Sequence, residues 1–561
     1  MNKSANHRYK AGFTIVELLV VIVVIGILAA ITVVSYTGIN KKAIVASLQS
    51  DLSGASDKLK MYSAENGTYP SDVTLTNGEY CPTPADTRYC FKLSSGNTKE
   101  SYTSTTSSFT FVIKNDTNYW SISDNSGPVA VIAAIGQSFV TAYGGTVNDY
   151  GKSIIQTTDG GFAITGQTSS YSAGDFDTFI SKYAADGTLS WTKTWGGTSA
   201  DANLSIIQTT DGGFATAGYT ASYGSGANDV LLSKYAADGT LSWTKTWGGA
   251  GNDTGFSIVQ TTDGGFALTG YTESYGSGSY DIFLIKYTSS GALSWSKVMG
   301  GSGADWGYSL IQTTDGGFAL TGMEGSYSDD GSYDIFLAKL TSSGVLSWFK
   351  TWDGPSSYSD DNGQSLIQTT DGGFAITGTT SSFGPTGYDM LLIKYNADGT
   401  LAWNTMWVGP NVDYGITLTQ TSDSGFVVSG YTTSYGAGDR DVLLAKYTSG
   451  GVLLWSKTWG STGIDSGSSI IQTNDNGFAI TGYTNSYGVG GYEIFLAKYN
   501  SNGIIANCSS PACQSPTPTI VNPSSTTANP TPTIVNPSPT TSSPPTSTNS
   551  PLLTRTTIVA P

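Results

Sequence analysis

Apolar and polar residues follow three different patterns along the chain. Residues 13–34 are almost all apolar, with Glu17 as the single acid, and a helix of this length spans roughly 30 Å, enough to cross a membrane. From Ile44 to Tyr62 apolar residues recur every three or four positions, which predicts that an amphipathic continuation of this helix ends near residue 66. Beyond residue 137, short runs of β-branched and aromatic residues alternate with glycine-rich turns, as in an all-β domain.

The all-β region consists of seven repeats. The phrase Gln-Thr-Thr-Asp-Gly-Gly-Phe-Ala recurs with small changes, and the repeats are 52 residues apart except for one interval of 56. Periods of this size mark propellers or solenoids. Each repeat holds four strand-like runs, which we name a to d, separated by tight turns such as Asp-Gly, and four strands make one propeller blade. The phrase begins at Gln156, Gln208, Gln260, Gln312, Gln368, Gln420 and Gln472.

The sequence also indicates how the ring closes. The last repeat lacks a fourth strand and has Asn507 where the others carry tryptophan, while residues 137–145 align with residues 189–197. The orphan strand at the start therefore completes the last blade, which leaves no open sheet edge. A solenoid would instead need two distinct caps, and none is visible. The predicted fold class is mainly β: a seven-bladed β-propeller with strand-swapped ring closure.

These patterns divide the chain into six parts. We expect a leader at 1–12, a membrane and stalk helix at 13–66, a small α+β head at 67–127, a linker at 128–136, the propeller at 137–513 and an extended, disordered tail at 514–561. The tail is rich in Pro, Ser and Thr and cannot build a core. Four cysteines in two close pairs predict two local disulfides in an exported protein. The pairs are Cys81 with Cys90, and Cys508 with Cys513.

One tryptophan per blade suits the space between blades, and we interpret this series as core packing, with carbohydrate stacking as the alternative. The series is Trp191, Trp243, Trp295, Trp348, Trp403 and Trp455.

The candidate binding face carries the longer b–c and d–a loops. Because the chain enters the propeller at strand d and leaves after strand c, both on the tight-turn face, we expect the loop-rich face to point away from the membrane. Its candidate residues are Tyr171, Tyr223, Tyr275, Tyr327, Tyr435 and Tyr487, and the doubled acids Asp329, Asp330, Asp360 and Asp361.

Each d–a loop also carries an aspartate, which we interpret as a turn cap. We expect no cofactor; calcium is the one ion that the doubled acids would suit, although no calcium-binding motif is present. The aspartates are Asp149, Asp201, Asp253, Asp305, Asp361, Asp413 and Asp465.

The N-terminus, with Gly12 followed by Phe13-Thr-Ile-Val-Glu17, resembles the class III signal of type IV prepilins. The resemblance implies cleavage after Gly12 by a prepilin peptidase, N-methylation of Phe13, and contact of Glu17 with the freed amine of a neighbouring subunit. It also implies a long pilin helix and a small pilin head before the propeller. A plain signal anchor is the alternative. The family often has a proline near the end of this segment, and this chain has none there. The propeller motif resembles bacterial secreted β-propeller repeats.

Composition narrows the function classes. The formal charge of −16 argues against a nucleic-acid partner, because phosphates would be repelled. The single histidine, His7, lies in the predicted leader, so a mature chain would lack the imidazole that Ser-His-Asp, Cys-His or His-zinc chemistry needs. Only carboxylate chemistry such as glycoside hydrolysis would remain open. We therefore predict no catalytic residue and no bound metal.

These patterns favour a non-catalytic type IV pilin, minor or at the filament tip, that displays a propeller for adhesion or surface contact. Expected partners are other pilin subunits, the peptidase, the membrane, and surface glycans or host proteins. The chain would start in the cytoplasmic membrane and end outside the cell. The alternatives are a pseudopilin of a type II-like secretion system and a displayed carbohydrate-active enzyme.

Overall fold

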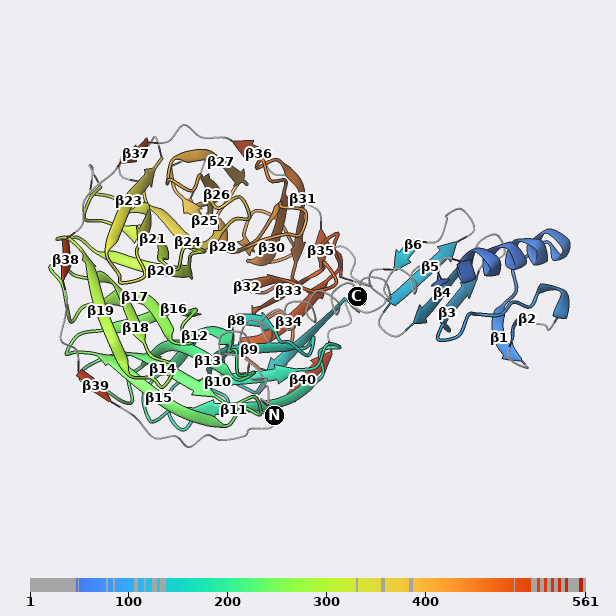
Figure 1. Ribbon diagram of the computed structural model, residues 1–561, viewed down its shortest axis with the longest axis horizontal. Helices are drawn as coiled ribbons and strands as arrows, with labels where there is room; N and C mark the ends of the chain where they lie inside the picture. Colours follow the sequence, from blue (N-terminus) through green and yellow to red (C-terminus); the bar gives the residue numbers. More distant parts are fainter. Residues whose placement is uncertain are drawn as a thin grey trace, which may run out of the picture. The chain divides into compact units, whose positions relative to one another are not determined.

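In the computed structural model the chain forms two compact units, Met1–Ile135 and Gly136–Pro561 (Figure 1). The structure describes residues 47–48, 50–76, 79–83, 86–104, 109–115, 118–123, 129–131, 138–328, 331–354, 359–382, 387–488, 490–505, 512–514, 519–521, 526–528, 533–535, 540–542 and 554–557.

The first unit joins one helix to two small antiparallel sheets. Residues 50–66 are helical, and Gly67, with a φ of 75°, ends the helix by donating its N–H to the Ser63 carbonyl. The sheets have the orders β1-β2 and β3-β4-β5-β6. The last strand, β6, lies within the segment predicted as a linker. The elements are β1 (Asp72–Thr76), β2 (Glu79–Thr83), the 3-10 turn η1 (Thr87–Tyr89), β3 (Thr98–Ser104), β4 (Phe109–Asn115), β5 (Asn118–Ser123) and β6 (Val129–Val131).

The predicted apolar face of the helix lies in the core of this unit. Leu48, Leu52 and Leu59 are buried together with Val73 and Phe111. The predicted membrane segment, 13–34, lies outside the described residues. Among the residues that are described, no helix is both long and apolar enough to span a bilayer.

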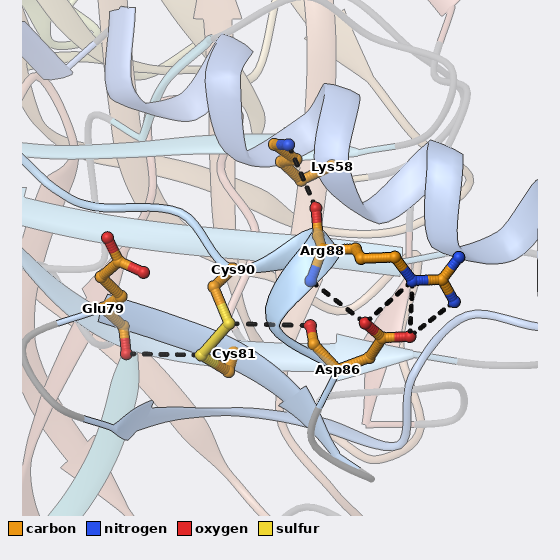
Figure 2. Close-up of a disulfide and its surroundings, with 6 residues drawn as sticks. All are labelled: Lys58, Glu79, Cys81, Asp86, Arg88 and Cys90. Carbon is orange, nitrogen blue, oxygen red and sulfur yellow. Dashed lines mark hydrogen bonds and ion pairs between the residues drawn. A yellow bond between two sulfur atoms is a disulfide. The ribbon is translucent and has the colours of Figure 1, made fainter.

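A disulfide closes the loop after β2. Cys81 and Cys90 are bonded, as predicted, and within the loop the Arg88 guanidinium lies 2.8 Å from the Asp86 carboxylate (Figure 2). Lys58 of the helix donates to the Arg88 carbonyl at 3.2 Å, which ties the loop to the helix. The second predicted pair is described at one end only: Cys513 is disulfide-bonded, and Cys508 lies outside the described residues.

The second unit is a closed ring of seven antiparallel blades (Figure 1). Each blade contains four sequential strands, a to d, except that the last blade borrows its d strand. The blades are β8 (Asp149–Gln156), β9 (Phe162–Thr168), β10 (Asp177–Tyr183), β11 (Leu189–Trp195); β12 (Asp201–Gln208), β13 (Phe214–Thr220), β14 (Asp229–Tyr235), β15 (Leu241–Gly248); β16 (Asp253–Gln260), β17 (Phe266–Thr272), β18 (Asp281–Tyr287), β19 (Leu293–Gly300); β20 (Asp305–Gln312), β21 (Phe318–Glu324), β22 (Asp334–Leu340), β23 (Leu346–Asp353); β24 (Asp361–Gln368), β25 (Phe374–Thr380), β26 (Asp389–Tyr395), β27 (Leu401–Val408); β28 (Asp413–Gln420), β29 (Phe426–Thr432), β30 (Asp441–Tyr447), β31 (Leu453–Trp459); and β32 (Asp465–Gln472), β33 (Phe478–Thr484), β34 (Glu493–Tyr499) with β7 (Phe139–Gly144).

The strand-swapped closure is seen as the sequence predicts. β7 pairs antiparallel with β34, in a register that sets Phe139 opposite Lys498 and Tyr143 opposite Ile494. The first strand of the propeller region is thus the fourth strand of the last blade. Two strands more than 340 residues apart in sequence are therefore neighbours.

The repeated tryptophans pack between blades, as expected. Trp191 of blade 1 lies edge-on to Phe214 of blade 2, with ring centroids 6.0 Å apart, and Trp455 of blade 6 meets Phe478 of blade 7 at 6.2 Å. The remaining tryptophans of the series make the same contact with the next blade. The apolar surface that they bury holds adjacent blades together.

Polar contacts repeat around the ring in step with these tryptophans. The Gln208 amide oxygen accepts from the Thr158 N–H of the preceding blade at 2.9 Å. The equivalent bond occurs at every junction, including the closing one, where Gln156 accepts from Asn474. The invariant glutamine of the repeat thus binds one blade to the next.

The tail differs from the predicted disordered segment, because its described pieces are strands on the outer rim of the ring (Figure 1). They pair antiparallel with the d strands of blades 6, 5, 4, 3, 2 and 7, in that order along the chain. The tail therefore travels around the ring against the direction of the blades. Its strands are β35 (Cys513–Gln514), β36 (Thr519–Val521), β37 (Thr526–Ala528), β38 (Thr533–Val535), β39 (Thr540–Ser542) and β40 (Thr554–Thr557).

The spacing of the tail matches the spacing of the blades. β36 to β39 begin at threonines seven residues apart, and these four threonines pair with equivalent positions of the d strands, such as Val408 and Gly300. Seven extended residues reach at most about 25 Å, so the first residues of consecutive tail strands can lie at most this far apart. In the sequence a proline stands directly before β36, β38 and β39, and threonine, isoleucine and valine suit a strand. The composition of the tail therefore does not reveal that its strands recur every seven residues.

We predict that the tail stabilises the ring. Deleting residues 537–561 should lower the unfolding temperature, and deleting 519–561 should lower it further, because each lost strand exposes a d-strand edge. Differential scanning calorimetry of the full chain and of both truncations measures the effect. Equal unfolding temperatures in all three would contradict a stabilising role of the tail.

Candidate functional site

The predicted site residues fall into two groups. Gly12, Phe13 and Glu17, together with Asp329 and Asp330, lie outside the described residues. Cys508 lies outside them as well, and the remaining predicted residues are described.

The one aspartate per d–a loop is a structural cap, as the sequence analysis favours. Asp149 is fully buried; its Oδ2 accepts from the Gly145 N–H at 2.9 Å and from the Ser170 hydroxyl at 2.7 Å, and its Oδ1 from the Thr168 hydroxyl. The aspartates that begin the other a strands are also fully buried. In each blade this carboxylate holds the d–a loop in place at the start of strand a.

The six candidate tyrosines are partly buried side chains between blades. The Tyr275 hydroxyl donates to the Gly248 carbonyl of the preceding blade at 2.6 Å, and its ring packs on Trp247 at 5.2 Å. Tyr171, Tyr223, Tyr327 and Tyr487 make the same hydrogen bond, and Tyr435 packs on Trp407. These contacts give the tyrosines a packing role at the outer part of the loop-rich face.

The tight-turn face carries one ion pair per blade. In blade 3, Lys286 Nζ lies 3.0 Å from the Asp263 carboxylate, and the Thr261 hydroxyl and Lys286 together lower the pKa of Asp263 to about 2. The same pair occurs in the other six blades. The pair thus repeats around this face; blade 7 differs in that the Asp475 side chain is 21% exposed, against 63–66% for the other six aspartates.

Pairs of buried carboxylates lie at the junctions between blades. A Cβ added at Gly196 would lie 2.1 Å from Asp177 Oδ1 and 2.8 Å from Asp201 Oδ2, so only glycine fits between the two acids. Burial, with a smaller contribution from Asp201, raises the pKa of Asp177 to about 6. Gly248, Gly300 and Gly460 separate equivalent pairs.

Two junctions depart from this pattern. At the junction of blades 4 and 5, Asp353 replaces the glycine, and carboxylate oxygens of Asp334, Asp353 and Asp361 all lie within 4.8 Å of one another. Burial raises the pKa of Asp361 to about 7. These three side chains are the group of described residues with the spacing that a cation would need.

At the junction of blades 5 and 6, Val408 takes the place of the glycine; it follows Trp407, which pairs with Met390, the residue after Asp389. Asp389 is fully buried, and neither of its carboxylate oxygens has a hydrogen-bond partner. Burial, followed by repulsion from Asp413, raises its pKa to about 7.

The middle of the ring holds a polar channel. A cavity of about 390 Å³ is lined by inner-strand residues of all seven blades, many of them serines. Lys152 contributes the positive charge among the lining residues; burial lowers its pKa, and its amine lies 5.3 Å from the Tyr150 ring centroid.

Aromatic rings surround the mouth of this channel on the loop-rich face. On one side Tyr150 lies 5.1 Å from Tyr483; on the other side Trp306 lies 5.7 Å from Tyr333. We call this set the aromatic rim. Its members are Tyr150, Phe176, Tyr219, Phe256, Tyr271, Tyr280, Trp306, Tyr308, Tyr333, Tyr388, Tyr414, Tyr431, Tyr483 and Tyr492.

A second cavity, of about 200 Å³, opens beside the rim where blades 4, 5 and 6 meet. Tyr333, Tyr388 and Tyr414 line it together with Asp360 and Asn362. Of the predicted binding residues, Asp360 and Asp361 therefore do line a cavity. The aromatic side chains beside them were missed, although they occupy positions at which the repeats differ from one another.

Comparisons with known proteins match the N-terminus and the propeller separately. Residues 7–33 match the family model "Prokaryotic N-terminal methylation motif". The N-terminus therefore carries a prepilin-like methylation motif.

Curated relatives cover the same part of the chain. It is similar to the type II secretion system core protein G of Aeromonas hydrophila, 39% identical over 64 residues, and of Escherichia coli (strain K12), 40% identical over 60 residues. Each match covers 11% of this chain and 45% or 41% of the relative, so the chain spans less than half the length of these relatives.

Solved structures cover the propeller. Sqt1 from Chaetomium thermophilum is 11% identical, with a TM-score of 0.35, over 65% of this chain and 98% of its own. A protein of unknown function from Dyadobacter fermentans is 12% identical, with a TM-score of 0.35, over 64% and 98%. We draw no functional conclusion from these two.

We predict that Asp389 makes stability depend on pH. Because its folded pKa of about 7 exceeds the unfolded value of about 4, its favourable contribution is present below pH 4 and is lost as pH rises through 7. Asp389→Asn should therefore unfold a few degrees higher than the parent at pH 8, and at nearly the same temperature at pH 4.

Thermal unfolding followed by circular dichroism at both pH values measures this difference. Asp439→Asn, at an exposed position in the loop before β30, serves as the control and should shift neither value. A variant Asp389→Asn that is less stable at pH 8 would contradict the assignment.

Proposed function

We propose that this chain is a pilin-type subunit, minor or at the filament tip, that displays the propeller outside the cell for adhesion or surface contact, without catalysis. The observation that carries the proposal is the methylation motif at residues 7–33 on the same chain as a closed seven-bladed ring. The motif supports membrane insertion, processing by a prepilin peptidase and assembly with other pilin subunits. The ring adds a large rigid surface that assembly itself does not need.

The geometry of the ring supports contact through the loop-rich face. The tight-turn face repeats the same lysine–aspartate pair in every blade, whereas the loop-rich face carries the channel mouth, the aromatic rim and the cavity of about 200 Å³. Selective binding requires a surface with distinct chemistry, and this face has it. Surface glycans and host proteins are the proposed partners.

A second candidate function is a pseudopilin of a type II-like secretion system. The similarity to type II secretion system core protein G favours it. Immunogold labelling with antibodies to the propeller separates the two: label on surface fibres or their tips supports the displayed pilin, and label confined to the cytoplasmic membrane supports the pseudopilin.

Glu17 tests the assembly role of the N-terminal segment. We predict that Glu17→Ala reduces incorporation into sheared surface filaments about tenfold or more, because an unpaired terminal amine in an apolar filament core is costly. Quantitative immunoblotting of the sheared fraction against whole cells measures this. Glu79→Ala, at an exposed position of the first unit, is the control and should assemble normally; normal assembly of both variants would contradict the role given to Glu17.

A further inference from the structure

The blades are nearly identical except at a few positions near the channel mouth. The first residue of strand a is aspartate, its last is glutamine, and the first residue of strand b is phenylalanine in all seven blades. By contrast, the second residue of strand a is Tyr, Ala, Thr, Trp, Asn, Tyr and Ser in blades 1 to 7, and the residue before strand c is Phe, Asn, Tyr, Tyr, Tyr, Arg and Tyr. The fold does not need these residues to be alike, so their chemistry is free to serve binding.

At the junctions of blades 4, 5 and 6 these variable positions form the cavity of about 200 Å³. Tyr388 precedes strand c of blade 5, and its ring lies 5.4 Å from that of Tyr414 in blade 6, tilted by 48°. Tyr333, in the equivalent position of blade 4, lines the same cavity. Three blades thus each supply one tyrosine to a single small site.

The polar lining of this cavity has unused hydrogen-bonding capacity. Thr379 is only 1% exposed, and its hydroxyl has no hydrogen-bond partner. Asn362 Oδ1 likewise has none. Buried polar atoms are normally paired, and leaving one unpaired is costly, so these two atoms point to a ligand that brings hydroxyl or amide groups.

The acids of the cavity set the charge of that ligand. Asp360 accepts from the Tyr388 hydroxyl at 3.3 Å, and Asp361 lines the same space. The Asp360 carboxylate repels an anion at so small a site, and Asp361, whose pKa burial raises to about 7, adds to this repulsion as the pH rises, so phosphates, sulfates and sugar acids are disfavoured. A neutral ligand with hydroxyl groups suits both the acceptors and the charge.

We propose that this cavity binds a single uncharged sugar residue at the end of a glycan. A pyranose presents an apolar C–H face, which stacks on tyrosine, and a rim of hydroxyls, which bond Asp360, Asn362 and Thr379. The cavity is smaller than the roughly 300–1,000 Å³ of pockets for drug-sized ligands, so it admits one ring rather than a long chain. This inference rests on the proposed surface-contact function and names the ligand class of that contact.

A glycan array probed with the full chain tests the proposal. The array presents glycans that end in galactose, mannose, glucose or N-acetylglucosamine, and matched glycans that end in sialic acid or sulfated sugar. We expect binding to one or more of the uncharged group and none to the anionic group. No binding to any uncharged terminus, or a preference for anionic ones, overturns the proposal.

Variants locate the site of any bound glycan. Tyr388→Ala should weaken binding at least tenfold by removing one stacking ring, and Val452→Ala, at an exposed position of the tight-turn face, should leave it within twofold. Asn362→Leu keeps the volume but removes the amide, and should weaken binding about fivefold, which keeps the test valid if Tyr388→Ala fails to fold. Unchanged binding in both Tyr388→Ala and Asn362→Leu, or an equal loss in Val452→Ala, overturns the proposal.

The outcome separates this inference from the function on which it rests. Purified chain that binds no glycan, while immunogold places it on surface fibres, removes the sugar site and leaves the displayed pilin standing. Label confined to the cytoplasmic membrane removes the display function, whereas the array and the variants still report on the cavity.

Discussion

Closure of the ring is the constraint on which the rest of the propeller depends. β7 must pair with β34 for the last blade to have four strands, and this is possible only if seven blades fill a full circle. Each blade must then have the same angular width, which explains why the glutamine hydrogen bond recurs at every junction and the tryptophan–phenylalanine contact at all but the closing one. The extra residues of the one longer interval are accommodated in loops, where they leave this geometry unchanged.

The same constraint divides the residues of a blade into fixed and free positions. Most side chains that pack between blades recur from blade to blade, because they set the angular width of the blade. Side chains at the channel mouth do not have to meet this requirement, and there the repeats differ: Trp306 and Tyr414 occupy the position that is alanine in blade 2. Near-identical repeats thus produce an asymmetric surface on a symmetric support, and the cavity between blades 4, 5 and 6 is one result.

Most of the fold could be predicted because its signals are periodic. Seven copies of one phrase predict seven blades, and the missing tryptophan at Asn507 together with the orphan strand predicts the closure. The Cys81–Cys90 bridge follows from short sequence spacing. Two features could not be obtained this way. The proline-rich composition of the tail predicts an extended segment. Its seven-residue period does not by itself indicate strands, because edge pairing depends on partner strands elsewhere in the chain. The cavity brings together Tyr333, Tyr388 and Tyr414 from three blades, and only the three-dimensional ring makes them neighbours.

The position of β7 has a mechanical consequence. This strand is the first element of the second unit, and it is hydrogen-bonded on both edges, to β34 over five residue pairs and to β40 over four. A force that pulled β7 along its own axis would have to break the bonds on both edges together, in shear. A single strand opened one bond at a time, like a zipper, gives way at much lower force. β7 thus joins the start of the propeller sequence to the tail in one sheet, and this sheet resists a pull along the strand.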